Sequence, residues 1–151
     1  MPNQTTKSIV VGAPVSQVYA IWSNFENFPH FMENIKSVTK TGDKMSHWVM
    51  SGPLGVNIEW DAETTRMEEN ARIAWNSRDN STITTSGQVT FTDLEGKQTE
   101  VTVTLQYEPP AGIAGDVVAK LFSNPEKRLE EDLQNFKHYA ESPGNTRTVN
   151  E

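Results

Sequence analysis

Residues 124–141, NPEKRLEEDLQNFKHYAE, predict a long helix at the end of the folded chain. Asn124 suits the N-cap, Pro125 the first helical position, and Glu126 the first turn, where an acidic side chain interacts favourably with the helix dipole. One apolar face follows, formed by side chains that recur at intervals of four, three and four: Leu129, Leu133, Phe136 and Ala140. A helix over 125–141 spans ~25 Å, enough to cross several strands.

A series of strands precedes this helix, between about residues 34 and 107. Residues 56–62, 83–91 and 101–107 alternate between apolar and polar side chains, and the turn signals Thr41-Gly42-Asp43 and Glu95-Gly96 separate neighbouring segments. This pattern predicts antiparallel strands with one dry and one wet face. The acidic residues that alternate in the first stretch belong to the wet face, where we interpret them as a solvated surface and not as a metal site: Glu59, Asp61 and Glu63.

The N-terminal part predicts one strand and two short helices. Ser8–Val11 is short, β-branched and closed by Gly12, and Pro14 is suited to begin a helix whose apolar residues continue to Trp22. Asn24 then suits the cap of a second short helix. A further helical segment is expected at residues 115–122. The order of one strand, two short helices, six strands and a long helix predicts an α+β fold with the sheet wrapped around the last helix.

Composition narrows the function classes. The 151 residues contain no cysteine, which excludes disulfides, thiolate metal sites and a cysteine nucleophile. A net charge of −7 without a basic cluster argues against nucleic acid as a partner. No apolar run approaches the ~20 residues of a membrane span, so we expect a cytoplasmic protein. Residues 1–141 are expected to form one domain and 142–151 a disordered tail.

Four segments carry a family resemblance: Pro14–Ser23, Asn27–Met32, Ala71–Ser77 and Leu129–Lys137. Together with the element order, they resemble the polyketide cyclase/dehydrase branch of the START-like helix-grip (SRPBCC) superfamily, which also contains coenzyme Q-binding proteins. The resemblance implies a curved antiparallel sheet of about seven strands that grips the C-terminal helix. It also implies a mostly apolar cavity between the sheet and that helix. Such a fold does not by itself determine function.

Apolar residues on the dry face are the candidate ligand-binding residues, because ligand sites are mostly apolar with a few placed polar groups. Each of these side chains also suits an ordinary core. The strand candidates and those from the segment before the last helix are Trp48, Met50, Trp60, Trp75, Phe91, Leu105, Val118, Leu121 and Phe122.

Polar candidates are fewer. Ser77, Thr85 and Thr64 share the dry parity, where we expect backbone partners for their hydroxyl groups. Weak candidates for catalysis are Tyr107, at the end of its strand, and His30, near the short helices. His47 has the opposite parity from Trp48, and His138 is expected on the surface. Arg66 would reach the dry face only if its strand stayed regular past Thr64.

Two function classes lead, with a third behind them. The first is a binder or carrier of a hydrophobic small molecule such as a lipid, a quinone or a polycyclic compound, with no cofactor and no metal. The second is a polyketide cyclase/aromatase or dehydratase-type enzyme that uses polar groups of the cavity. The third is a protein-interaction module that uses the outer face of the sheet. The residues identify neither the ligand nor the oligomeric state.

Overall fold

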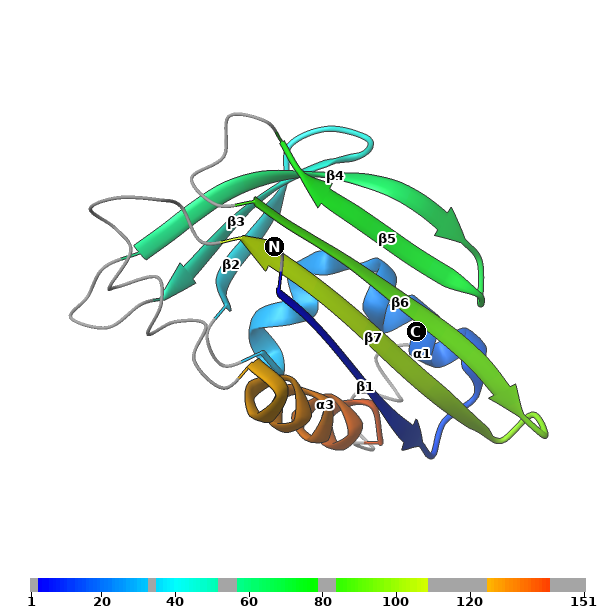
Figure 1. The fold of residues 1–151 in the computed structure, drawn as a ribbon. Coiled ribbons are helices and arrows are strands. Elements are labelled where there is room, and N and C mark those ends of the chain that lie inside the picture. The colour runs from blue at the N-terminus through cyan, green and yellow to red at the C-terminus, as the bar shows by residue number, and fades with distance from the viewer. Residues whose placement is uncertain (1–2, 33–34, 52–56, 79–83, 109–124, 142–151) are drawn as a thin grey trace.

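A seven-stranded antiparallel sheet curls around two short helices, and a long helix lies beside its first strand (Figure 1). The computed structural model describes residues 3–32, 35–51, 57–78, 84–108 and 125–141. The elements in chain order are β1 (Asn3–Val11), α1 (Val15–Ser23), the 3₁₀ helix η1 (Phe25–His30), β2 (Ile35–Lys40), β3 (Met45–Ser51), β4 (Asn57–Glu68), β5 (Arg72–Ser77), β6 (Thr84–Leu94), β7 (Gln98–Glu108) and α3 (Pro125–Glu141).

The strands are arranged in the order β1-β7-β6-β5-β4-β3-β2, so that β1 and β2 form the two edges. The predicted helix-grip α+β fold is therefore confirmed, including the element order and the extent of the last helix. The expected helix at 115–122 and the expected tail at 142–151 lie outside the described residues. Strand β1 is longer than the sequence predicted, because its polar first half pairs with β7 throughout, for example Thr5 with Leu105.

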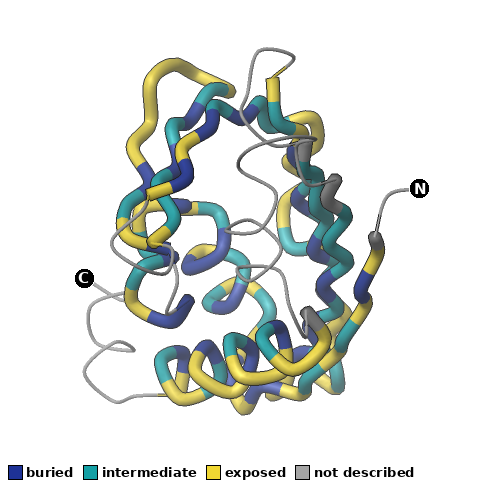
Figure 2. Tube along the Cα trace, turned by 60° about the vertical axis from the view of Figure 1, so that its left-hand side comes forward, coloured by how far each residue is buried: buried dark blue, intermediate teal, exposed yellow. Residues whose placement is uncertain are grey.

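The alternation of apolar and polar residues corresponds to the two faces of the sheet. In β4, Ile58 and Trp60 are buried while Asn57 and Glu59 are exposed. Figure 2 shows the same alternation of buried and exposed residues along the strands. The concave face is therefore the dry face, and it is covered by α1, η1 and α3.

Aromatic side chains join the helices to one another. Trp22 of α1 is completely buried, and its ring centroid lies 5.2 Å from that of Phe28, 5.4 Å from Phe31 and 4.9 Å from Phe136 of α3. The cap of η1 is formed as predicted, because the Asn24 side chain accepts a hydrogen bond from the Glu26 backbone N–H at 3.3 Å. The second short helix is a 3₁₀ helix that contains Pro29.

The C-terminal end of α3 is fixed to the turn between β1 and α1. Glu141 Oε2 accepts a hydrogen bond from the Gly12 backbone N–H at 2.6 Å and another from Lys137 Nζ. The Lys137 hydrogen bond, followed by that from Gly12, lowers the pKa of Glu141. Lys137 also donates to the Val10 carbonyl oxygen at 3.1 Å. These contacts fix one end of the long helix against the sheet.

A close approach between β5 and β6 depends on the absence of a side chain. Trp75 pairs with Gly87, and its indole lies so close to β6 that a Cβ atom at residue 87 would be 2.3 Å from Trp75 Cζ2. Two carbon atoms cannot approach to this distance, so the observed position of Trp75 requires glycine at position 87.

We predict that Gly87→Ala destabilises the protein by ~1–3 kcal/mol, since the added methyl group displaces the Trp75 ring. Gly42→Ala is the matched control, because its Cβ would meet Met45 at an ordinary 3.6 Å, and a change below ~0.5 kcal/mol is expected. Urea unfolding measures both. Combining Gly87→Ala with Trp75→Leu should recover part of the loss, and equal effects of the two glycine variants would contradict this account.

Candidate functional site

Three tryptophans form a stack on the concave face of the sheet, one each from β3, β4 and β5. Trp48 lies in the middle, with its ring centroid 5.8 Å from Trp60 at an interplanar angle of 14° and 6.1 Å from Trp75 at 19°. We call Trp60, Trp48 and Trp75 the tryptophan stack. All three are buried. Half-buried residues surround this part of the concave face, among them Met50 and Leu105.

The strand register produces this arrangement. Trp48 and Trp60 are direct cross-strand partners, so their side chains emerge side by side on the same face. Phe25 packs against the stack from η1, with ring centroids 5.9 Å from Trp48 and 6.0 Å from Trp75. Trp48 Nε1 donates a hydrogen bond to Ser46 Oγ at 2.8 Å. The central ring is thus held by a hydrogen bond at its edge as well as by its contacts with neighbouring rings.

Trp60 Nε1 is buried and has no hydrogen-bond partner among the described residues. A buried donor without an acceptor costs about 1–3 kcal/mol. The stacked ring of Trp48 cannot serve as acceptor, because the N–H bond lies in the Trp60 plane and therefore does not point at a parallel neighbour. Trp22 Nε1 is likewise unpartnered, but Trp22 meets Phe28 edge-on at 79°, in an aromatic environment that offers weak π acceptors.

The polar side chains near the stack interact with the backbone. Thr85 Oγ1 donates to the Gln106 carbonyl oxygen at 3.0 Å, and the Thr85 backbone N–H donates to Ser77 Oγ at 3.0 Å. Both residues are half-buried. These hydroxyl groups therefore hold β5, β6 and β7 together at this end of the sheet.

The remaining predicted site residues lie elsewhere or outside the described part. Phe91 is buried below α1, edge-on to Tyr19 at 5.5 Å and 75°. His30 is exposed and stacks on Tyr139 of α3 at 5.5 Å, so its placement favours a surface role, and a catalytic role stays a prediction. Tyr107 lies in β7 opposite Thr85, and its side chain is outside the description. The same holds for the predicted ligand residues of the segment before α3, Val118, Leu121 and Phe122.

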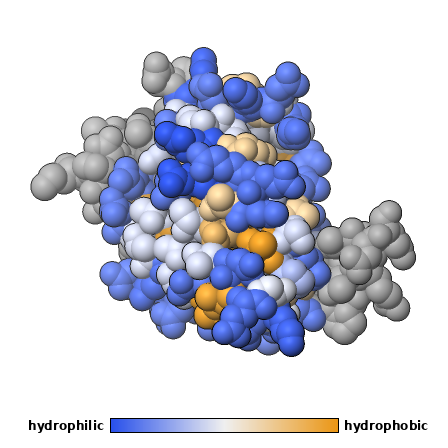
Figure 3. All heavy atoms as spheres, turned by 90° about the vertical axis from the view of Figure 1, so that its right-hand side faces the viewer, coloured by the Kyte–Doolittle hydropathy of each residue, from blue (hydrophilic) through white to orange (hydrophobic). Residues whose placement is uncertain are grey.

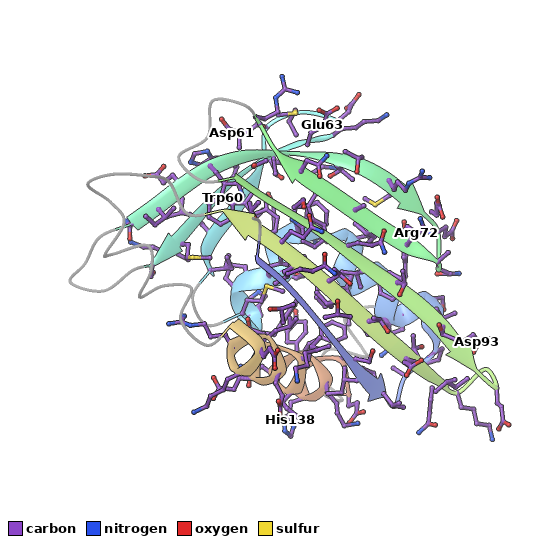
Figure 4. The ribbon with its side chains drawn as sticks, viewed as in Figure 1. Trp60, Asp61, Glu63, Arg72, Asp93 and His138 are labelled. Atoms are coloured by element: carbon purple, nitrogen blue, oxygen red, sulfur yellow. The ribbon has the colours of Figure 1, made fainter. Side chains whose placement is uncertain are left out.

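A β-bulge decides the position of Arg66. The β4–β5 register shifts between Thr64 and Arg66, which moves Arg66 to the parity of Ala74 on the convex face. There it is exposed and forms an ion pair with Glu68 at 3.1 Å. The condition for placing Arg66 on the dry face is therefore not met. His138 is exposed on α3, as predicted (Figure 4).

The described residues contain neither a cluster of metal-ligating side chains nor a membrane-spanning helix. No group of three or more histidine, aspartate or glutamate side chains in that part of the chain is placed to hold a metal ion. None of its helices is both long and apolar enough to cross a membrane.

Residues 11–134 match the sequence profile of the family described as polyketide cyclase/dehydrase and lipid transport. The chain belongs to this family. A relative from Streptomyces lincolnensis, an uncharacterized 17.2 kDa protein of the melC2-rnhH intergenic region, is 31% identical over 142 residues, which are 94% of this chain and 92% of the relative. The START-like helix-grip fold is therefore supported by sequence as well as by structure.

Solved structures share the fold of this polyketide cyclase/dehydrase family member. A protein from Deinococcus radiodurans is 33% identical and superposes with a TM-score of 0.75, covering 92% of this chain and 97% of that one. The Zhui aromatase/cyclase from a Streptomyces species is 13% identical with a TM-score of 0.71, covering 93% and 94%. The family supports either hydrophobic ligand binding or a cyclase role.

The convex face of the family member carries a charged cluster that the sequence did not predict. His47 Nδ1 lies 2.8 Å from Asp61 Oδ1, and His47 Nε2 lies 2.9 Å from Glu59 Oε1. Figure 4 shows Asp61 and Glu63 on the convex side of β4, with Trp60 on the concave side. The hydrogen bond that protonated His47 donates to Asp61, followed by the one that it donates to Glu59, raises the pKa of His47. The direct pairing of His47 with Asp61 across β3 and β4 creates the cluster.

We predict a pH-dependent loss of stability for His47→Asn in this family member. Because the pKa of His47 is raised in the folded state, its contribution is complete below the unfolded pKa of ~6.5 and is lost as the pH rises through the folded pKa. Replacement should cost ~0.2–1 kcal/mol near pH 5.5, as for a partly exposed ion pair, and nothing near pH 9.

Urea unfolding at both pH values measures this effect. In a Glu59→Gln, Asp61→Asn background, His47→Asn should lose its pH dependence. A loss of stability that is the same at both pH values would contradict the assigned role of the two carboxylates.

Proposed function

We propose that this protein binds and carries a hydrophobic small molecule that contains a flat ring system, and that the ligand lies against the tryptophan stack. The observation that carries the proposal is the stack itself, with the unpartnered Trp60 Nε1 at its end. Stacked indoles provide a large, rigid apolar surface, and few polar groups are needed to orient a ligand on it.

The Trp60 indole supplies the orienting group. Its N–H is a donor only, so the ligand group that meets it is an acceptor such as a carbonyl, quinone or hydroxyl oxygen. A hydrogen bond formed on binding removes the cost of the buried donor. The ligand class is therefore an oxygenated ring compound, such as a quinone or an aromatic polyketide, in preference to a plain hydrocarbon.

A cyclase or aromatase is the second candidate, and the likeness to the Zhui aromatase/cyclase favours it. Such an enzyme needs polar groups that are free to move a proton. The Thr85 hydroxyl, half-buried near the stack, is instead used in a backbone hydrogen bond. This engagement favours a carrier over a catalyst. Conversion of a poly-β-keto substrate by the purified protein would reverse the order of the two proposals.

An interaction module has less support. Figure 3 shows one face of the molecule, on which hydrophobic residues form small areas separated by hydrophilic ones. Protein interfaces more often use larger contiguous apolar patches. The convex side of β4 is charged, with Glu59, Asp61 and Glu63 all in ion pairs.

Native mass spectrometry of freshly purified protein, followed by organic extraction, tests the carrier proposal. The expected result is a near-stoichiometric bound compound with oxygenated rings. Protein without such a ligand, combined with turnover of a polyketide substrate, would support the cyclase.

Substitutions of Trp60 separate stacking from hydrogen bonding. With emodin, a hydroxylated anthraquinone, as probe, Trp60→Phe should weaken binding about fivefold, because it retains a ring and loses one hydrogen bond of ~1 kcal/mol. Trp60→Ala should weaken it more than about tenfold, since the stacking surface is also lost. Isothermal titration calorimetry measures both.

Phe91→Leu is the matched control, because Phe91 is a buried aromatic residue that packs on α1. It should leave emodin affinity within about twofold of wild type, which corresponds to less than ~0.5 kcal/mol. Emodin binding that depends on Phe91 but not on Trp60 would refute the assignment of the site.

A further inference from the structure

A pocket opens between the α1–η1 junction, the β2–β3 hairpin and the end of β4. It has a volume of about 370 Å³, which lies at the lower end of the range for small-molecule sites. We propose that this pocket binds a small amphipathic anion, such as an aromatic or aliphatic carboxylic acid. We call it the hairpin pocket. The proposal is independent of the function proposed for the tryptophan stack.

The wall of the hairpin pocket includes apolar side chains that reach solvent. Met67 lines the pocket, and half of its surface is exposed, although it pairs with the buried Ile73 on the dry parity. Met45 lines it from the hairpin and Phe25 from η1. An apolar ligand body bound here would cover Met67, the larger of the exposed hydrophobic side chains among the described residues.

The charges around this pocket are mostly positive in a chain of net charge −7. Lys40, Lys44 and Arg66 line it, against one acidic residue, Asp43. Arg66 is paired with Glu68, whereas Lys40 and Lys44 form no ion pair with any residue that the structure describes. Two ammonium groups are thus available to an anionic group of the ligand.

A buried hydroxyl adds a polar contact inside the pocket. Ser46 lines the pocket and is only 2% exposed. Its oxygen accepts the hydrogen bond from Trp48 Nε1, and its own proton has no acceptor within the described part of the chain. An oxygen atom of a ligand would provide that acceptor.

The hairpin pocket is separated from the tryptophan stack by shared side chains. Phe25 lines the pocket and contacts Trp48 and Trp75. Ser46 also lines it and is bonded to Trp48. A ligand in the hairpin pocket is therefore separated from the tryptophan stack by Phe25 and Ser46. Its charged group would point toward the lysines, and its apolar part would contact Phe25 and Met67.

Calorimetric titration with phenylbutyrate, and with the uncharged phenylbutanol as its matched analogue, tests the proposal. At low ionic strength, phenylbutyrate should bind at least about fivefold more tightly than phenylbutanol, and added salt should reduce this preference. A double variant, Lys40→Gln with Lys44→Gln, should weaken phenylbutyrate about tenfold and leave phenylbutanol unchanged.

The control is Lys97→Gln with Lys127→Gln, which makes the same change in net charge at two exposed positions away from the pocket. It should change phenylbutyrate affinity less than about twofold. Equal effects of the two double variants, or no binding by wild type, would overturn the proposal. Loss of phenylbutyrate binding in Trp60→Ala with no effect of the lysine changes would place this ligand at the stack instead. Emodin binding is measured separately, so the two proposals can fail independently.

Discussion

The absence of a Cβ atom at Gly87 is the constraint on which the candidate site depends. Because Gly87 presents only backbone, Trp75 can lie against β6. In that position it stacks on Trp48, which in turn stacks on Trp60. Phe25 contacts two of these rings and belongs to the aromatic cluster that includes Phe28. One close backbone approach thus connects the sheet, the short helices and the candidate ligand surface.

The strands β3 and β4 have different chemistry on their two faces. On the concave side Trp48 pairs with Trp60, and at the adjacent position of the antiparallel pair His47 pairs with Asp61 on the convex side. Strand alternation requires this separation, since successive side chains point to opposite faces. The charged cluster therefore joins β3 and β4, two of the three strands that carry the stack. The ion pair on the convex face therefore supports the two strands whose concave side would contact a ligand.

Much of the fold follows from local patterns in the sequence. The spacing of Leu129 and Phe136 and the cap signals before them predicted α3 with its observed bounds, and alternation placed Trp48 and Trp60 on one face. Features that depend on the pairing register of the strands could not be predicted from these patterns. A bulge past Thr64 moves Arg66 to the other face, and the contact between His47 and Asp61 requires the pairing of β3 with β4. Neither leaves a signal in composition or periodicity.

The central claim is that a hydrophobic ligand lies on the tryptophan stack, and indole N–H NMR tests it most directly. The chain has four tryptophans, so four indole resonances are expected. Titration with emodin should shift the resonances of Trp60, Trp48 and Trp75, the first most strongly, because its N–H gains an acceptor. Trp22, enclosed by Phe28, Phe31 and Phe136, should change little. Saturable binding that leaves the Trp60 resonance unmoved would contradict the account.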